Sequence, residues 1–261
     1  MRFGVCIGAD MHNLAKLREY GYDYAEINLS GIANWTPEQV EEARAEMVRT
    51  GIFAETCNGF FFSFEKGYLT SDRVDFAALE EYIRRALGKA SRLGLQVAVI
   101  GSGAARTILD ESRREEGEEQ FARVLRLAGD IGAEFGIKIV IEPLRYEECN
   151  TVNTVADGIA MCRRANHPNV FVLADFYHVS MTGESLDTIR SCGSMLQHVH
   201  LARNNPDRRM PLDAADAVDC ARWAEALREN GYNARISLEG AFGDDWNDTV
   251  QKMRTVLKVF E

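Results

Sequence analysis

Four residues that can bind a metal ion or move a proton stand at the ends of apolar segments of this sequence. They are Glu142 after IKIVI, Asp175 after VFVLA, His200 within LQHVHLA and Glu239 after ARISL. A charge at the end of an apolar strand is costly to bury unless a cation or another strong partner neutralises it. Three carboxylates and one imidazole suit a divalent ion such as Mn²⁺, Mg²⁺, Co²⁺ or Zn²⁺. The alternative is that each residue only caps a strand end or a helix, but four on successive units favour a metal site.

The spacing of these residues matches a repeated strand-and-helix unit. They are separated by 33, 25 and 39 positions. Apolar segments predict strands at 2–8, 22–28, 52–57, 95–101, 137–142, 170–175, 196–202 and 234–239. Amphipathic stretches between them predict helices, and 261 residues shared among eight units give about 33 residues a unit. Eight such units predict an α/β protein with a single (β/α)₈ TIM-barrel domain over residues 1–261, whose active site lies at the C-terminal ends of the strands.

A doubly wound open sheet is the competing fold. It is disfavoured because no GxGxxG follows the first strand, and the GSG at 101–103 is too short for a dinucleotide fingerprint. Helix signals support the alternation of strands and helices. Thr36 and Pro37 form an expected helix start, and glycines that predict helix ends stand at positions 51, 94, 136 and 231.

The composition restricts the partners. The chain has 30 Lys and Arg against 40 Asp and Glu, a net charge of −10, which repels nucleic-acid phosphates. Its six cysteines are scattered without a CxxC pair, as expected for reduced thiols. No leader-like segment is recognisable, and the apolar runs are far shorter than the roughly 20 residues of a membrane span. We therefore expect a cytoplasmic protein that binds neither nucleic acid nor membranes.

Several motifs occur in a recognisable order. They are IEPL at 141–144, ADFYH at 174–178, HVH at 198–200 and ISLE at 236–239. In that order they resemble the xylose isomerase-like TIM barrel superfamily, in its sugar (phosphate) isomerase/epimerase branch, which includes ketose 3-epimerases and hydroxypyruvate isomerases. The resemblance implies one divalent metal, commonly Mn²⁺ in this branch, bound by Glu142, Asp175, His200 and Glu239.

The resemblance also implies residues that contact the substrate, and assembly into a homodimer or homotetramer. The expected contacts are Glu148, His178 and one arginine of the pair Arg208 and Arg209, with Asn58 and Arg106 added from weaker motif matches. The chain departs from the family where Arg145, Tyr146 and Glu147 follow EPL. The sequence therefore does not indicate which side chain of that loop contacts the substrate.

The two histidines of the HVH motif have different expected roles. His198 and His200 are two positions apart on a strand, so both point into the barrel. The one nearer the C-terminal end, His200, is the expected ligand. His198 then lies one layer deeper, as a hydrogen-bonded core residue or a support for the site.

The expected chemistry is removal of a proton next to a carbonyl, through a metal-stabilised enediolate. Glu142 and Glu239 form the expected acid–base pair. Return of the proton from the opposite face gives an epimer, and its return to the adjacent carbon gives aldose–ketose isomerisation. The expected substrate is a sugar or a sugar-derived keto-acid.

Three other functions fit parts of the pattern. A metal-dependent dehydratase of a keto-cyclitol or sugar acid begins with the same proton removal, and the sequence does not separate it from an epimerase. A phosphodiesterase related to endonuclease IV needs extra histidines after the third and fourth strands, where Cys57-Asn58 and Gly101-Ser102 stand. A barrel that only binds sugar is disfavoured by the intact acid and base candidates.

Overall fold

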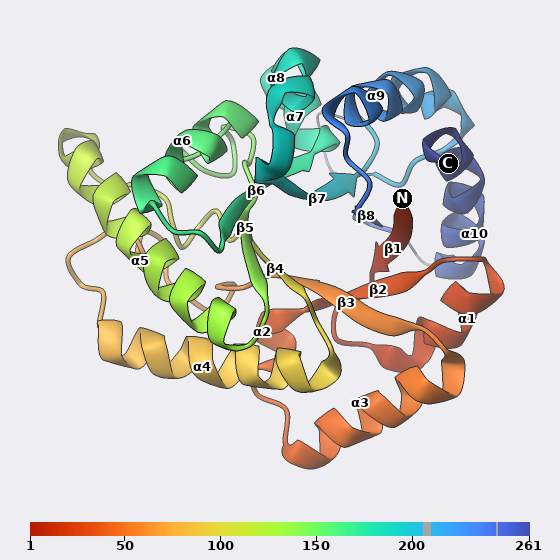
Figure 1. Ribbon diagram of the computed structural model, residues 1–261, viewed down its shortest axis with the longest axis horizontal. Helices are drawn as coiled ribbons and strands as arrows, with labels where there is room; N and C mark the ends of the chain where they lie inside the picture. The colour runs from red at the N-terminus through yellow and green to blue at the C-terminus, as the bar shows by residue number, and fades with distance from the viewer. Residues whose placement is uncertain (206–209, 244) are drawn as a thin grey trace.

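A ring of parallel strands forms the centre of the computed structural model, which describes residues 1–205, 210–243 and 245–261 (Figure 1). Within these residues eight strands close into a barrel in sequence order. They are β1 (Arg2–Cys6), β2 (Tyr24–Asn28), β3 (Phe53–Asn58), β4 (Val97–Ile100), β5 (Lys138–Ile141), β6 (Val170–Asp175), β7 (Leu196–Leu201) and β8 (Arg235–Leu238). The predicted (β/α)₈ barrel is confirmed, and each strand lies within one residue of its predicted segment or inside it.

Helices surround the ring on its outside (Figure 1). They are α1 (Leu14–Glu19), α2 (Leu29–Ile32), α3 (Pro37–Thr50), α4 (Phe76–Leu93), α5 (Arg114–Glu134), α6 (Val155–Ala165), α7 (Phe176–Thr182), α8 (Leu186–Ser191), α9 (Ala217–Asn230) and α10 (Trp246–Val256). Short 3₁₀ helices are η1 (Met11–Asn13), η2 (Glu111–Arg113), η3 (Gly193–Met195), η4 (Ala214–Asp216) and η5 (Leu257–Phe260). In the described part of the chain, no helix is both long enough and apolar enough to cross a membrane.

The ends of α3 show how local sequence sets the helix boundaries. The Thr36 side chain accepts a bond from the Gln39 N–H, and the Gln39 side chain accepts one from the Thr36 N–H, so two N–H groups at the helix start are satisfied. Pro37 occupies the first turn, where its missing N–H costs nothing. Gly51 ends the helix at φ 69°, a left-handed conformation that glycine adopts without strain. The predicted start and end of this helix are confirmed.

The barrel interior has an apolar part and a polar part. The apolar part is a small buried cluster on β4, β5 and β6, made of Val97, Val99, Val140 and Leu173. The register of the other strands brings polar side chains to one level. It pairs Glu26 with Thr56 between β2 and β3, and His200 with Ser237 between β7 and β8. A polar network therefore fills one side of the barrel below the predicted site.

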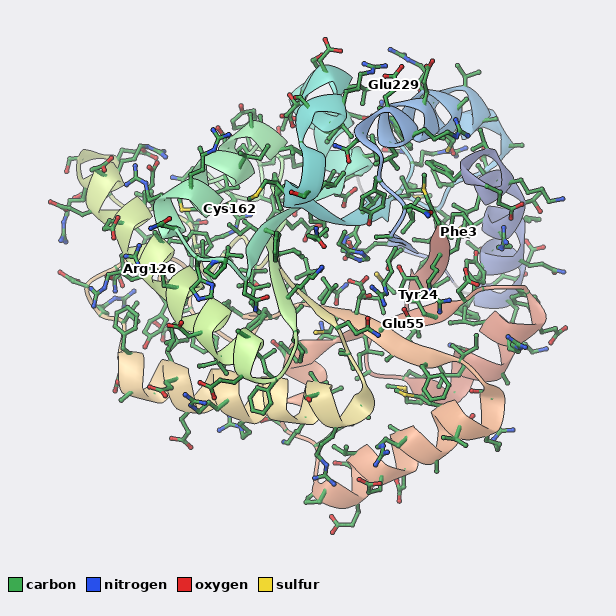
Figure 2. The ribbon with its side chains drawn as sticks, viewed as in Figure 1. Phe3, Tyr24, Glu55, Arg126, Cys162 and Glu229 are labelled. Atoms are coloured by element: carbon green, nitrogen blue, oxygen red, sulfur yellow. The ribbon has the colours of Figure 1, made fainter. Side chains whose placement is uncertain are left out.

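The N-terminal end of the barrel is closed by paired charges. Glu55 of β3 accepts bonds from Arg2 of β1 and from Nε of Arg235 of β8. Arg235 also donates to the side chain of Gln96, just before β4, at 2.7 Å. Figure 2 labels Glu55 and Tyr24 near the middle of the ring. These contacts tie strands together across the end opposite the predicted site.

Candidate active site

The four predicted ligands lie together at the C-terminal ends of β5, β6, β7 and β8. Glu142, Asp175, His200 and Glu239 each offer one ligand atom, and these atoms all lie within 4.8 Å of one another. His200 Nδ1 lies 3.3 Å from Glu142 Oε1 and 2.8 Å from Glu239 Oε2. All but Glu239 are buried, and its side chain is 21% exposed. This donor set fits one divalent cation of the kind that oxygen and imidazole ligands hold.

Backbone hydrogen bonds position Glu142 and Glu239 at the C-terminal end of the barrel. Glu142 and Glu239 directly follow β5 and β8, and their N–H groups donate to Ile100 and Leu201 of the preceding strands, each at 3.1 Å. The backbone ladder therefore continues to the residue that carries each carboxylate. Gly101 leaves the space beside Glu142, because a Cβ there would overlap Glu142 Oε2.

Asp175, at the junction of β6 and α7, both caps a helix and belongs to the ligand group. Its Oδ1 accepts a bond from the Tyr177 N–H at 2.8 Å and so caps the helix. Its Oδ2 lies 3.9 Å from His178 Nε2, and one of its carboxylate oxygens belongs to the ligand group. The helix start thus fixes the rotamer of this predicted ligand.

Glu26 of β2 is a buried part of the site that the sequence analysis missed. Its Oε1 lies 2.9 Å from His200 Nε2, and its Oε2 lies 2.7 Å from His198 Nε2. Thr56 and Ser237 donate to the same Oε2 at 2.7 and 2.6 Å. The only signal in the sequence was a carboxylate inside a predicted strand, whereas the predicted ligands stand at strand ends. His198 lies below His200, as predicted.

Burial and charge act against each other in this network. Burial alone would raise the pKa of Glu26, but His200 and His198 outweigh it and hold the pKa well below its usual range. Burial alone would lower the pKa of His200, but the Glu26 and Glu239 carboxylates raise it well above its usual value. Burial lowers the pKa of His198, because the contact with Glu26 offsets it only in part. Of the two histidines, His200 lowers the pKa of Glu26 more.

Two of the expected substrate residues, Asn58 and His178, lie within 4 Å of predicted ligands, and a third, Glu148, lies on the loop after β5. Asn58, at the end of β3, donates from Nδ2 to Glu239 Oε1 at 3.3 Å. His178 is buried in α7, and its Nδ1 accepts the Arg145 N–H at 3.1 Å. Glu148 is exposed on the loop after β5, where its Oε1 accepts from Arg145 Nε at 2.9 Å. Arg145, which lies where the loop departs from the family pattern, is therefore hydrogen-bonded to both His178 and Glu148.

The remaining expected substrate residues are three arginines. Arg208 and Arg209 lie outside the described residues. Arg106 is fully buried, and its guanidinium donates to the carbonyl oxygens of Gly101, Glu142 and Thr151 at 2.7, 2.7 and 2.5 Å. Each of the three guanidinium nitrogens thus donates to a backbone carbonyl oxygen rather than to a substrate. The expectation of a substrate contact is therefore corrected: Arg106 ties together the backbone beneath Glu142.

Comparison with known proteins agrees with the fold and places the chain in a family. The family described as xylose isomerase-like TIM barrel matches residues 14–258. A D-psicose 3-epimerase of Agrobacterium fabrum (strain C58) is 26% identical over 251 residues, covering 90% of this chain and 83% of the relative. A 3-dehydro-D-guloside 4-epimerase of Escherichia coli (strain K12) is 25% identical over 228 residues, covering 86% and 84%.

A solved structure resembles the whole chain. A D-psicose 3-epimerase in the presence of D-fructose superposes with a TM-score of 0.82 at 20% identity, over 99% of this chain and 97% of that one. At this identity the likeness supports the barrel fold alone.

Proposed function

The chain belongs to the xylose isomerase-like TIM barrel family, and from this premise we propose that it is a divalent-metal-dependent sugar epimerase or isomerase. The observation that carries the proposal is the convergence of Glu142, Asp175, His200 and Glu239 at the end of the barrel where such enzymes act. The names of the two similar relatives share one chemical feature. Carbon 3 of psicose and carbon 4 of a 3-dehydro sugar both adjoin a carbonyl, where a proton is acidic enough to be removed.

The four converging residues would hold the metal. When bound, the cation supplies positive charge that stabilises the enediolate left by proton removal. Among Mn²⁺, Mg²⁺, Co²⁺ and Zn²⁺ we propose Mn²⁺, because three of the four residues offer the carboxylate oxygens that suit it.

We propose Glu142 and Glu239 as the acid–base pair. They come from β5 and β8, and their oxygens lie 3.3 and 2.8 Å from the same atom, His200 Nδ1. One carboxylate removes the proton from the carbon next to the carbonyl, and the other returns it from the far face, which inverts that carbon. Return to the adjacent carbon by the same groups gives the aldose–ketose isomer. Asn58 orients Glu239 through its hydrogen bond.

His178 and Glu148 are proposed to hold substrate oxygens. The Arg145 N–H donates to His178 Nδ1, so a neutral His178 carries its proton on Nε2 and can donate it to a hydroxyl. Glu148 can accept from a hydroxyl while it remains paired with Arg145. Arg208 or Arg209 is proposed as a further contact.

Proton exchange in D₂O tests the function. The Mn²⁺-loaded protein is incubated with ketoses, keto-glycosides, ketose phosphates and keto-acids, and the products are followed by NMR. We expect deuterium at the carbon next to the carbonyl, together with an epimer or an isomer. Loss of water from the substrate would replace the proposal with a dehydratase. Sugar binding without any exchange would replace it with a binding protein.

A further inference from the structure

We propose that Glu26 is a positioning residue for His200, holding the imidazole so that its Nδ1 lone pair is available to a cation bound by the four ligands. This inference rests on the metal site of the proposed function and extends it to a strand that contributes no ligand to the four-residue group. Glu26 and His200 are both fully buried, on β2 and β7.

The two ring nitrogens of His200 face different groups. Nε2 lies 2.9 Å from Glu26 Oε1, whereas Nδ1 faces Glu142 and Glu239. A neutral imidazole has one N–H and one lone pair. Donation from Nε2 to a carboxylate therefore leaves the lone pair on Nδ1, the atom nearest the other ligands. A carboxylate on the far nitrogen also raises the basicity of a metal-binding histidine.

The bonds to Glu26 argue against its acting as a ligand itself. Atoms of Cys6, Glu26 and His200 also lie within 4.8 Å of one another, which raises the question of a second metal position. Four hydrogen-bond donors already surround the two carboxylate oxygens of Glu26: His198, His200, Thr56 and Ser237. Three of these donors bond Oε2 and His200 bonds Oε1, so both oxygens of Glu26 already take part in hydrogen bonds within the barrel.

The same four bonds make Glu26 a rigid support. Donors from β3, β7 and β8 fix both oxygens, and Ser237 is held in turn by Tyr24, whose hydroxyl lies 2.8 Å away. The carboxylate cannot rotate without breaking several buried bonds. A support held this firmly can fix the ring plane of His200 within the tolerance that a metal site needs.

The substitution Glu26→Gln tests this role through metal binding. Its amide NH₂ would face N–H and O–H donors, so the bond to His200 is lost or the ring turns. We expect Mn²⁺ affinity, measured by calorimetry, to fall about 10–100-fold, the usual effect of removing such a support. The absorption spectrum of the Co²⁺ form should change as the His200 ligand shifts.

Glu55→Gln is the matched control. It neutralises another glutamate of the barrel, but one bonded to Arg2 and Arg235 at the opposite end. We expect its Mn²⁺ affinity and Co²⁺ spectrum to match those of the unchanged protein. If Glu26→Gln also matched the unchanged protein in both measurements, the positioning role would be overturned.

NMR of the unchanged protein gives a second test that does not depend on a variant folding. With ¹⁵N-labelled histidine and bound Zn²⁺, we expect the proton of His200 on Nε2, and a proton on Nδ1 would overturn the inference. If the protein binds Mn²⁺ but exchanges no sugar proton, the proposed function fails while a weakened Glu26→Gln site still supports the role of Glu26. If it binds none of the ions, the inference fails as well.

Discussion

The two ends of the barrel use charged residues in opposite ways. At the N-terminal end, Glu55 lies between Arg2 and Arg235, so each negative charge has positive neighbours. At the C-terminal end, the ligand group brings together three carboxylates and one imidazole. The strands are the same eight, and the residue types overlap. The two ends differ in their balance of charge: Glu55 has two positively charged neighbours, whereas three carboxylates share one imidazole.

The paired charges at the N-terminal end are suited to stabilising the fold, whereas the group at the C-terminal end is the one proposed to carry the chemistry. Matched charges satisfy each other and can tie strands together. Like charges gathered at a buried site repel each other and cost stability unless a cation joins them. Groups held in this way are typical of functional sites. The comparison predicts opposite effects when a carboxylate is removed from each end.

Neutralising Glu142 or Glu239 should have the largest effect. We expect Glu142→Gln and Glu239→Gln each to lower turnover by about 10²–10⁴-fold, because a proton-transfer group is lost. Deuterium exchange into the substrate measures this loss. The midpoint of thermal unfolding of the metal-free protein should change little, because relief of repulsion among the carboxylates offsets the lost contact with His200. Near-normal turnover in either variant would remove that residue from the acid–base pair.

Removing the metal should have an effect of comparable size. Chelation should abolish proton exchange, and Mn²⁺ should restore it. An ion at about 100 times its dissociation constant should also stabilise the fold by about 2.7 kcal/mol, since it binds only the folded state. Thermal unfolding with and without Mn²⁺ measures this shift. Full activity after chelation would contradict the metal site at the C-terminal end.

Much of this contrast follows from the sequence, because the ligands lie at strand ends. Each of Glu142, Asp175 and Glu239 ends an apolar segment, and that pattern alone predicts the barrel edge where they meet. Glu26 lies inside a strand, and its partner His200 is 174 residues away in the chain. Recognising its role requires the register and closure of the barrel, which local patterns do not contain.

Arg106 is a residue whose approximate place could be predicted from the sequence but whose contacts could not. A loop arginine near the active end of a barrel has the same local sequence whether it points toward a substrate or beneath the loop. Only the folded chain brings the carbonyl groups of Gly101, Glu142 and Thr151 around its guanidinium. The direction of a long side chain depends on tertiary partners, so sequence could place Arg106 near the site but could not define its role.

A methyl group at Gly101 should give an intermediate effect at the C-terminal end. The added Cβ in Gly101→Ala would displace Glu142 Oε2, while the flexible side chain can move without unfolding the barrel. Displacement of a catalytic group by about 1 Å can cost on the order of 10²-fold in rate, so we expect a loss of up to that size. Steady-state kinetics and Mn²⁺ calorimetry measure the loss.

Gly88→Ala provides the control for that substitution. Gly88 lies in α4, where an added Cβ would make only ordinary contact with Phe135 at 3.6 Å. Activity should be unchanged, and the helix should gain up to about 1 kcal/mol. If Gly101→Ala were as active as Gly88→Ala, the space beside Glu142 would not matter for the chemistry.

Neutralising Glu55 should have the smallest effect on activity and a clear effect on stability. Glu55→Gln leaves Arg2 and Arg235 without their carboxylate at the N-terminal end, so we expect the free energy of unfolding to fall by about 1–3 kcal/mol in urea denaturation. Turnover and Mn²⁺ affinity of the folded variant should not change, because none of the four ligands contacts this group in the described residues. Loss of activity in the folded variant would mean that the two ends are coupled through the polar interior. In that case the division between stability at one end and chemistry at the other would not hold.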